Sequence, residues 1–160
     1  MGRAVGLGFI GLLQLVGAAS GATDPLRPLA RMRPGGADLA AAMPRFTVVR
    51  NVDELDAALR SAGRPSVLDF YADWCVSCKE MERFTFTDPA VQVKLAGALL
   101  LKADVTRNSA EDRALLRRFH LFGPPGTIFF DSAGREVGAA RVIGFQSSRR
   151  FLETLGTAGL

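Results

Sequence analysis

The two cysteines of this chain, Cys75 and Cys78, are separated by only two residues, and this spacing constrains the fold more than any other feature of the sequence. The stretch before them, SVLDFYA (Ser66–Ala72), is apolar except for Asp69, and this pattern predicts a buried central strand. The residues after Cys75 have a helical pattern, so the pair lies where a strand ends and a helix begins. A C-x-x-C in this position, among alternating strands and helices, indicates a redox-active dithiol.

Three uses of a cysteine pair compete at this point: a redox dithiol, half of a metal site and a structural disulfide. A structural zinc site needs about four ligands, and the single histidine, His120, follows a different predicted helix. A disulfide across so short a loop removes little entropy from the unfolded chain. The redox hypothesis is preferred, with Cys75 as the attacking thiol, because unpaired N–H groups and the dipole at a helix start favour a thiolate. Cys78, one turn further along, is then the resolving thiol.

Turn residues and hydrophobic periodicity divide the following part of the chain into alternating strands and helices. The predicted strands are Phe46–Arg50, Ser66–Ala72, Ala98–Val105, Gly126–Asp131 and Glu136–Phe145. The predicted helices begin after Asn51, at the cysteines, after Asp88, after Ser109 and at Ser147. Asn51 and Glu54 have the spacing of a capping box. This order predicts an α/β sheet with a hairpin at one edge.

The first 45 residues differ in composition from the rest. The segment AVGLGFIGLLQLVGAAS (Ala4–Ser20) is uncharged and follows Arg3, so residues 1–20 are predicted to be an apolar transmembrane helix or a signal segment. Residues 21–45 contain proline, glycine and arginine without strand or helix periodicity, which predicts a linker. Residues 46–160 are the predicted globular domain.

The basic character of the chain does not indicate a nucleic-acid partner. The formal net charge is +4, but residues 1–45 hold 5 arginines against 2 aspartates and therefore carry +3 of it. The predicted globular domain is close to neutral, so no basic face is expected for binding phosphate groups. A basic surplus beside an apolar segment points to a membrane surface instead.

The residues around the cysteines resemble a known family. YADWCVSCK resembles the thioredoxin active site. The longer run LDFYADWCVSCKEMERFTFTDPAVQVKL, with LLLKADVT, FGPPGTIFF and ARVIGF after it, is similar to the C-terminal periplasmic domain of the DsbD family of thiol:disulfide interchange proteins. This resemblance implies a thioredoxin-like fold with a central mixed sheet flanked by helices. It also likens residues 1–20 and the linker to that family's last transmembrane helix and its tether.

The resemblance implies a function as well. The chain is expected to be a protein-disulfide reductase that uses a Cys75–Cys78 redox disulfide. It would relay electrons from a membrane-embedded thiol donor to periplasmic thiol-disulfide proteins, at the periplasmic face of the bacterial inner membrane, either anchored or secreted. No cofactor and no metal are expected. The alternatives are a cytochrome-c-maturation-type reductase, a disulfide isomerase and a non-catalytic thioredoxin-fold binding module.

The resemblance assigns roles to three ionisable residues. Asp69 matches an acid buried behind the dithiol that assists proton transfer to and from the resolving cysteine, and burial should raise its pKa. Glu82 matches a second acid near the active site, and Lys102 matches a lysine near the buried acid. Two nearby carboxylates would oppose a low pKa of the attacking thiol. The competing interpretations are a solvated edge position for Asp69, a solvated helix face for Glu82 and a simple strand-end position for Lys102.

Three further residues are expected to contact a partner. In the thioredoxin fold the residue matching Trp74 shields the dithiol, although a large apolar loop residue is the plainer interpretation. Pro125 matches the fold's cis-proline, and the residue before it normally offers backbone groups to a partner's extended chain. Pro124 has no N–H, so one donor is missing there. Gly126 stands where the family often has threonine, and both departures put the usual mode of partner docking in question.

Overall fold

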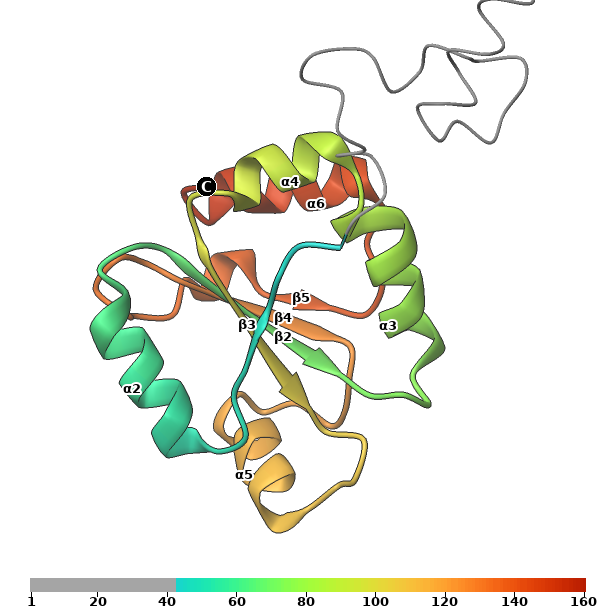
Figure 1. Ribbon diagram of the computed structural model, residues 1–160. Helices are drawn as coiled ribbons and strands as arrows, with labels where there is room; N and C mark the ends of the chain where they lie inside the picture. The colour runs from blue at the N-terminus through green and yellow to red at the C-terminus, as the bar shows by residue number, and fades with distance from the viewer. Residues whose placement is uncertain (1–42) are drawn as a thin grey trace, which may run out of the picture. The chain divides into compact units, whose positions relative to one another are not determined.

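The computed structural model describes residues 43–160 (Figure 1). The predicted apolar N-terminal helix and most of the predicted linker therefore lie outside the described residues. Within residues 43–160, no helix is both long and apolar enough to cross a membrane.

A five-stranded mixed sheet forms the centre of this part of the chain, in the order β1-β3-β2-β4-β5. The strands are β1 (Thr47–Val48), β2 (Ser66–Tyr71), β3 (Leu99–Asp104), β4 (Gly126–Phe130) and β5 (Val142–Ile143). Strands β1, β2 and β3 run parallel, whereas β4 is antiparallel to both β2 and β5. The predicted mixed sheet of a thioredoxin-like fold is confirmed.

Seven helical segments connect and cover these strands (Figure 1). They are α2 (Val52–Ala62), α3 (Val76–Glu80), the π-helix η1 (Met81–Phe86), α4 (Pro89–Leu95), α5 (Ala110–Arg118), the 3-10 helix η2 (Gly138–Ala140) and α6 (Ser148–Thr157). The predicted helix at the cysteines is thus an α-helical turn that continues as a wider π-helix.

Polar side chains cap the starts of α2, α4 and α5. The Asn51 carboxamide oxygen accepts the Glu54 N–H at 2.8 Å, as predicted, but the Glu54 carboxylate accepts from the N–H of Arg50 and not from that of Asn51. Ser109 and Asp112 form a complete capping box at α5. Asp88 caps α4, where Pro89 occupies the first turn and has no N–H that would need a partner.

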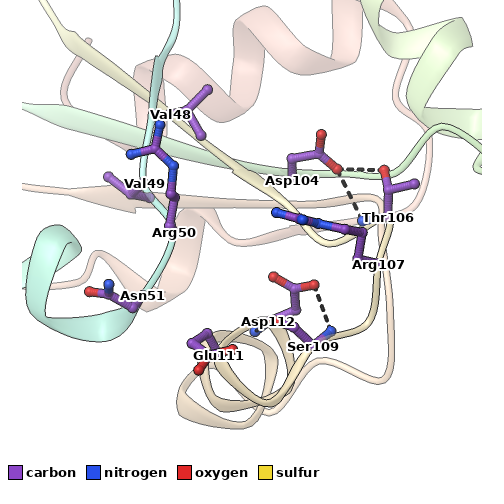
Figure 2. Close-up of a pocket in the computed structure, with 10 residues that line it drawn as sticks. All are labelled: Val48, Val49, Arg50, Asn51, Asp104, Thr106, Arg107, Ser109, Glu111 and Asp112. Atoms are coloured by element: carbon purple, nitrogen blue, oxygen red, sulfur yellow. Dashed lines mark hydrogen bonds between the residues drawn. The ribbon is translucent and has the colours of Figure 1, made fainter.

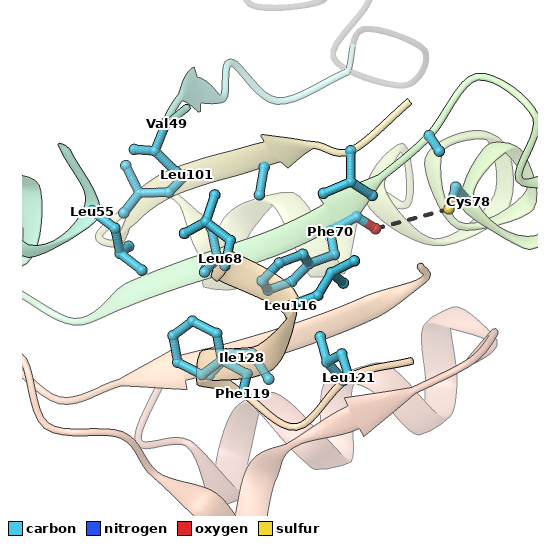
Figure 3. Packing of buried hydrophobic residues seen from close by; sticks show 14 of the residues in the cluster. Val49, Leu55, Leu68, Phe70, Cys78, Leu101, Leu116, Phe119, Leu121 and Ile128 are labelled. Atoms are coloured by element: carbon cyan, nitrogen blue, oxygen red, sulfur yellow. Dashed lines mark hydrogen bonds between the residues drawn. The ribbon is translucent and has the colours of Figure 1, made fainter. Parts of the chain in front are cut away.

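The alternation of side chains along β2 produces two hydrophobic clusters, one on each face of the sheet. Leu68 and Phe70 belong to the first cluster, which also contains apolar residues of α2 and α5 (Figure 3). Val67 belongs to the second cluster, which contains residues from η1, α4 and α6. Asp69 shares the face of Val67, so its carboxyl lies on the side of the sheet that η1 covers.

Two predicted strands are wrong in their extent. Glu136 makes only an isolated bridge to Phe130, and residues 138–140 form η2, so the predicted strand Glu136–Phe145 is reduced to β5. The Gly-Ala-Ala sequence of η2 lacks the β-branched and aromatic side chains that stabilise strands. The predicted strand Phe46–Arg50 is likewise reduced to the two residues of β1.

The contribution of the second cluster can be measured on α4, which presents a buried Leu95 and an exposed Val93. We expect Leu95→Ala to lower the free energy of unfolding by about 2–5 kcal/mol, because it leaves a cavity between α4 and the sheet. Val93→Ala, the matched control on the same helix, should change it by less than about 0.5 kcal/mol. Urea denaturation of both variants provides the test, and equal losses would contradict this packing.

Candidate active site

The cysteine pair lies at the start of α3, immediately after the end of β2. Cys75 is the N-cap of α3 and is joined to Cys78 by a disulfide, with their Cα atoms 5.3 Å apart. The backbone N–H of Cys78 donates to the Cys75 sulfur at 3.1 Å, and the Cys75 N–H donates to the Ala72 carbonyl at 3.0 Å. The helix start therefore directs a hydrogen-bond donor at the Cys75 sulfur, where it would stabilise a thiolate.

The two sulfurs differ in their surroundings. Cys75 is 6% exposed and Cys78 only 2%. The Cys78 sulfur lies 3.8 Å from the Phe70 carbonyl oxygen (Figure 3), which can accept a hydrogen bond from the Cys78 thiol once the disulfide is reduced. This asymmetry fits an attacking Cys75 and a resolving Cys78, roles that remain predictions.

A hydrogen-bond network holds the loop before Cys75. The Asp73 N–H donates to Thr106 Oγ1 at 3.0 Å, and Trp74 Nε1 donates to the Thr106 carbonyl at 3.2 Å. Thr106 Oγ1 in turn donates to the Asp104 carboxylate at the end of β3. Thr106 was not among the residues predicted for the site, and its place just after β3, the strand beside β2, is the sequence signal that could have indicated it.

The Trp74 side chain is 62% exposed, although its indole N–H is bonded. Val76, on the other side of Cys75, is exposed as well. Exposed apolar side chains that a partner protein could cover therefore lie on both sides of Cys75, the less buried of the two cysteines. Whether Trp74 shields the dithiol remains a prediction.

Asp69, Lys102 and Thr127 form a row across the middle of the sheet. Asp69 is paired with Lys102 on β3 and with Thr127 on β4, and paired residues in neighbouring strands project to the same face. The Thr127 hydroxyl donates to Asp69 Oδ1 at 3.4 Å. Asp69 is buried, so the alternative of a solvated edge position is excluded.

Glu82 on η1 completes this group from above the sheet. Its Oε1 atom lies 2.5 Å from Lys102 Nζ, and the two side chains are 25% and 17% exposed. Neither the solvated helix face considered for Glu82 nor the simple strand-end position considered for Lys102 describes this ion pair. The structure thus brings together the three ionisable residues that the resemblance singled out.

The surroundings of Asp69 change its acidity. The pKa of Asp69 is raised from 3.8 to about 7 by the combined effect of its neighbours. Burial raises this pKa, the Lys102 ammonium lowers it, the Glu82 carboxylate raises it and the Thr127 hydrogen bond lowers it. Burial is the largest effect because removing a carboxylate from water disfavours its charged form. A carboxyl with a pKa near neutrality can both accept and release a proton at physiological pH.

The loop before β4 contains the predicted cis-proline. The Pro124–Pro125 peptide bond is cis, as expected, and the Pro125 carbonyl accepts a hydrogen bond from the Gly144 N–H at 3.0 Å. At Gly126, a Cβ atom would come within 2.8 Å of Leu121 Cδ1. A threonine at this position would therefore require the Leu121 side chain to shift.

A pocket of about 570 Å³ has neither cysteine in its lining (Figure 2). Its lining residues are Val48, Val49, Arg50, Asn51, Asp104, Thr106, Arg107, Ser109, Glu111 and Asp112. The pocket carries both signs of charge, and Asp104 and Asp112 already accept hydrogen bonds from Thr106 and Ser109. It indicates no particular ligand.

The zinc alternative has no ligand set in the part of the chain that the structure describes. No group of three or more His, Cys, Asp and Glu side chains there is arranged to hold a metal ion. His120 lies just beyond α5 in an exposed, left-handed backbone conformation with φ of 53°.

The sequence of this chain is similar to those of known proteins with a thioredoxin-like domain. The profile of the thioredoxin-like domain family matches residues 52–159. The chain is 53% identical to the thiol:disulfide interchange protein DsbD of Ralstonia nicotianae, over 99% of this chain and 27% of that protein. It is 52% identical to DsbD of Yersinia pestis over 69% of this chain and 19% of that protein. The chain thus spans only about a quarter or less of the length of these relatives.

Solved structures agree with this assignment. The oxidised C-terminal domain of DsbD from Neisseria meningitidis is 36% identical, with a TM-score of 0.56, and the match covers 67% of this chain and 95% of that domain. A thioredoxin from Thermus thermophilus is 27% identical with a TM-score of 0.56, over 72% of this chain and 88% of that protein.

The raised pKa of Asp69 predicts a pH-dependent stability. Between pH 3.8 and about 7 the folded state holds a proton that the unfolded state has released, so stability falls as pH rises through this range. The full effect is roughly 4 kcal/mol. Asp69→Asn removes this titration, so its stability relative to the wild type should increase from pH 4 to pH 8. Denaturant unfolding across that range measures the difference, and parallel curves for the two proteins would contradict a raised pKa.

Proposed function

Since this chain belongs to the thioredoxin-like domain family, as a relative of the C-terminal domain of DsbD, we propose that it is a protein-disulfide reductase acting through Cys75 and Cys78. The observation that carries the proposal is the disulfide-linked pair at the start of α3, with the Cys78 N–H directed at the Cys75 sulfur. This arrangement stabilises one thiolate and keeps the second sulfur within bonding distance.

The exchange begins from the reduced pair. The Cys75 thiolate attacks one sulfur of a partner's disulfide, that S–S bond breaks, and the partner's other sulfur leaves as a thiolate. Cys75 and the partner are then joined in a mixed disulfide. Cys78 loses its proton and attacks the Cys75 sulfur, which releases the partner's second thiolate. The products are a partner dithiol and the Cys75–Cys78 disulfide, so two electrons have moved to the partner.

Asp69 is the proposed acceptor of the Cys78 proton. It precedes Phe70, whose carbonyl oxygen lies next to the Cys78 sulfur. Its pKa of about 7 suits a group that takes a proton in one half-reaction and returns it when a donor reduces the disulfide again. Glu82 and Lys102 adjust this carboxyl through their charges and are not proposed to contact the sulfurs.

The proposal also includes an electron source and a cellular location, and these depend on residues that the structure does not describe. Residues 1–20 are proposed to be a membrane anchor or export signal and residues 21–45 a tether, which would place residues 46–160 at the periplasmic face of the inner membrane. The donor would be a membrane-embedded dithiol and the recipients exported thiol proteins. A reductant in an oxidising compartment needs such a continuous supply of electrons.

Trapping provides the direct test of this function. Cys78→Ser should leave Cys75 able to attack but remove the resolving step, so a mixed disulfide with a disulfide-containing protein should accumulate on non-reducing gels. Cys75→Ser is the matched control and should trap nothing, because Cys78 is the more deeply buried sulfur. Failure of Cys78→Ser to form any mixed disulfide, in a folded protein, would contradict the relay and favour a non-catalytic binding module.

The missing donor at Pro124 predicts weak backbone docking of a partner. Pro124→Leu and Pro124→Ala would each restore an N–H immediately before the cis-proline. One net hydrogen bond of about 0.5–1.5 kcal/mol should raise kcat/KM for reduction of a disulfide-containing peptide by roughly 2- to 10-fold. If only the leucine variant is faster, the gain comes from apolar contact and the backbone explanation is wrong. Thermal unfolding of both variants controls for changes in the loop.

A further inference from the structure

The Lys102 ammonium is enclosed by more than its ion pair with Glu82. Its Nζ lies 4.6 Å from the centroid of the Tyr71 ring and 5.2 Å from the centroid of the Phe46 ring. Both distances are within the range in which a ring face attracts a cation, and the attraction grows when the cation is removed from water. Only 17% of the Lys102 side chain is exposed, so these rings replace much of its hydration shell.

Phe46 is fixed in this position from two sides. Its ring packs on Phe86 of η1, with centroids 5.4 Å apart, as part of the second hydrophobic cluster. Its backbone leads directly into β1, where Val48 is paired with Lys102. Just after β1, the Val49 N–H donates to the Lys102 carbonyl at 2.9 Å. The ring and the ammonium are thus held together by the same pair of strands.

The charges that face Asp69 come from two elements packed against β2. Lys102 on β3 lowers the pKa of Asp69 and Glu82 on η1 raises it, while Thr127 on β4 and Tyr71 on β2 are neutral. If the Lys102 ammonium turned toward water, solvent would weaken its attraction for the carboxylates of Asp69 and Glu82. The ammonium would then stabilise the ionised form of Asp69 less and leave the Glu82 charge less compensated, and both changes act in the same direction.

We propose that Phe46 is a positioning residue for the dithiol chemistry, because its ring holds the Lys102 ammonium against Glu82 and over the row that contains Asp69. This inference rests on the proposed role of Asp69 as the proton acceptor for Cys78. Phe46 lies where the predicted tether joins the domain, so this junction would influence proton transfer, although Phe46 itself contacts neither sulfur. Exchange of Phe46 for an aliphatic residue leaves the dithiol intact and alters the proton acceptor.

Fluorinated phenylalanines at position 46 test this role with little change of shape. Each added fluorine withdraws electron density from the ring face and weakens its attraction for a cation. In the reduced full-length chain, the carboxyl titration of Asp69, followed by ¹³C NMR, should move stepwise to higher pH from one to three fluorines, by about half a pH unit in total. Phe46→Leu should shift the midpoint at least as far, and Phe46→Tyr, which keeps an aromatic face, should restore it.

The matched control is the same fluorinated series at Phe151, which is buried against Phe86 and Phe129. It should leave the Asp69 midpoint unchanged. An unchanged midpoint in the Phe46 series, or an equal shift in the Phe151 series, overturns the proposal. The titration needs no partner protein, so its outcome is independent of whether Cys78→Ser traps a mixed disulfide.

Discussion

Burial of a carboxyl group in the central strand of the sheet is the constraint around which the site is arranged. Without compensation a buried charge is expensive, and Asp69 meets this cost by holding a proton up to near-neutral pH. The neighbouring side chains set where the proton is released: Thr127 donates a hydrogen bond, Lys102 contributes a positive charge and Glu82 a negative one. The same carboxyl that lowers stability at high pH is the group that we propose accepts the Cys78 proton.

Much of the fold could be predicted from local sequence signals. The apolar run of β2 and the caps at Asn51, Asp88 and Ser109 act within a few residues, and the structure places elements where these signals predict them. The lengths of β1 and β5 could not be predicted in this way. An edge strand ends where the neighbouring strand no longer provides N–H and C=O groups for backbone hydrogen bonds, and this depends on residues far away in the chain.

The candidate site, too, could be predicted from local sequence signals only in part. The cysteine spacing and the charged residue in β2 are visible in the sequence, and the positions of Glu82 and Lys102 became meaningful only through family resemblance. The register of β3 and the π-helical turn of η1, which bring these two side chains together, have no local signature. Thr106 and Phe46 were missed because each acts through a contact between segments distant in sequence, one through a backbone carbonyl and the other through a ring face.

The two edge strands of the sheet, β1 and β5, are each only two residues long. Exposed edge strands can pair with strands of other protein molecules and so start aggregation, and very short edge strands are one way in which natural proteins prevent this. Under the proposed function, partner proteins dock at the cysteine end of the domain, and two edge strands this short leave few unpaired backbone groups to which a partner's strand could add.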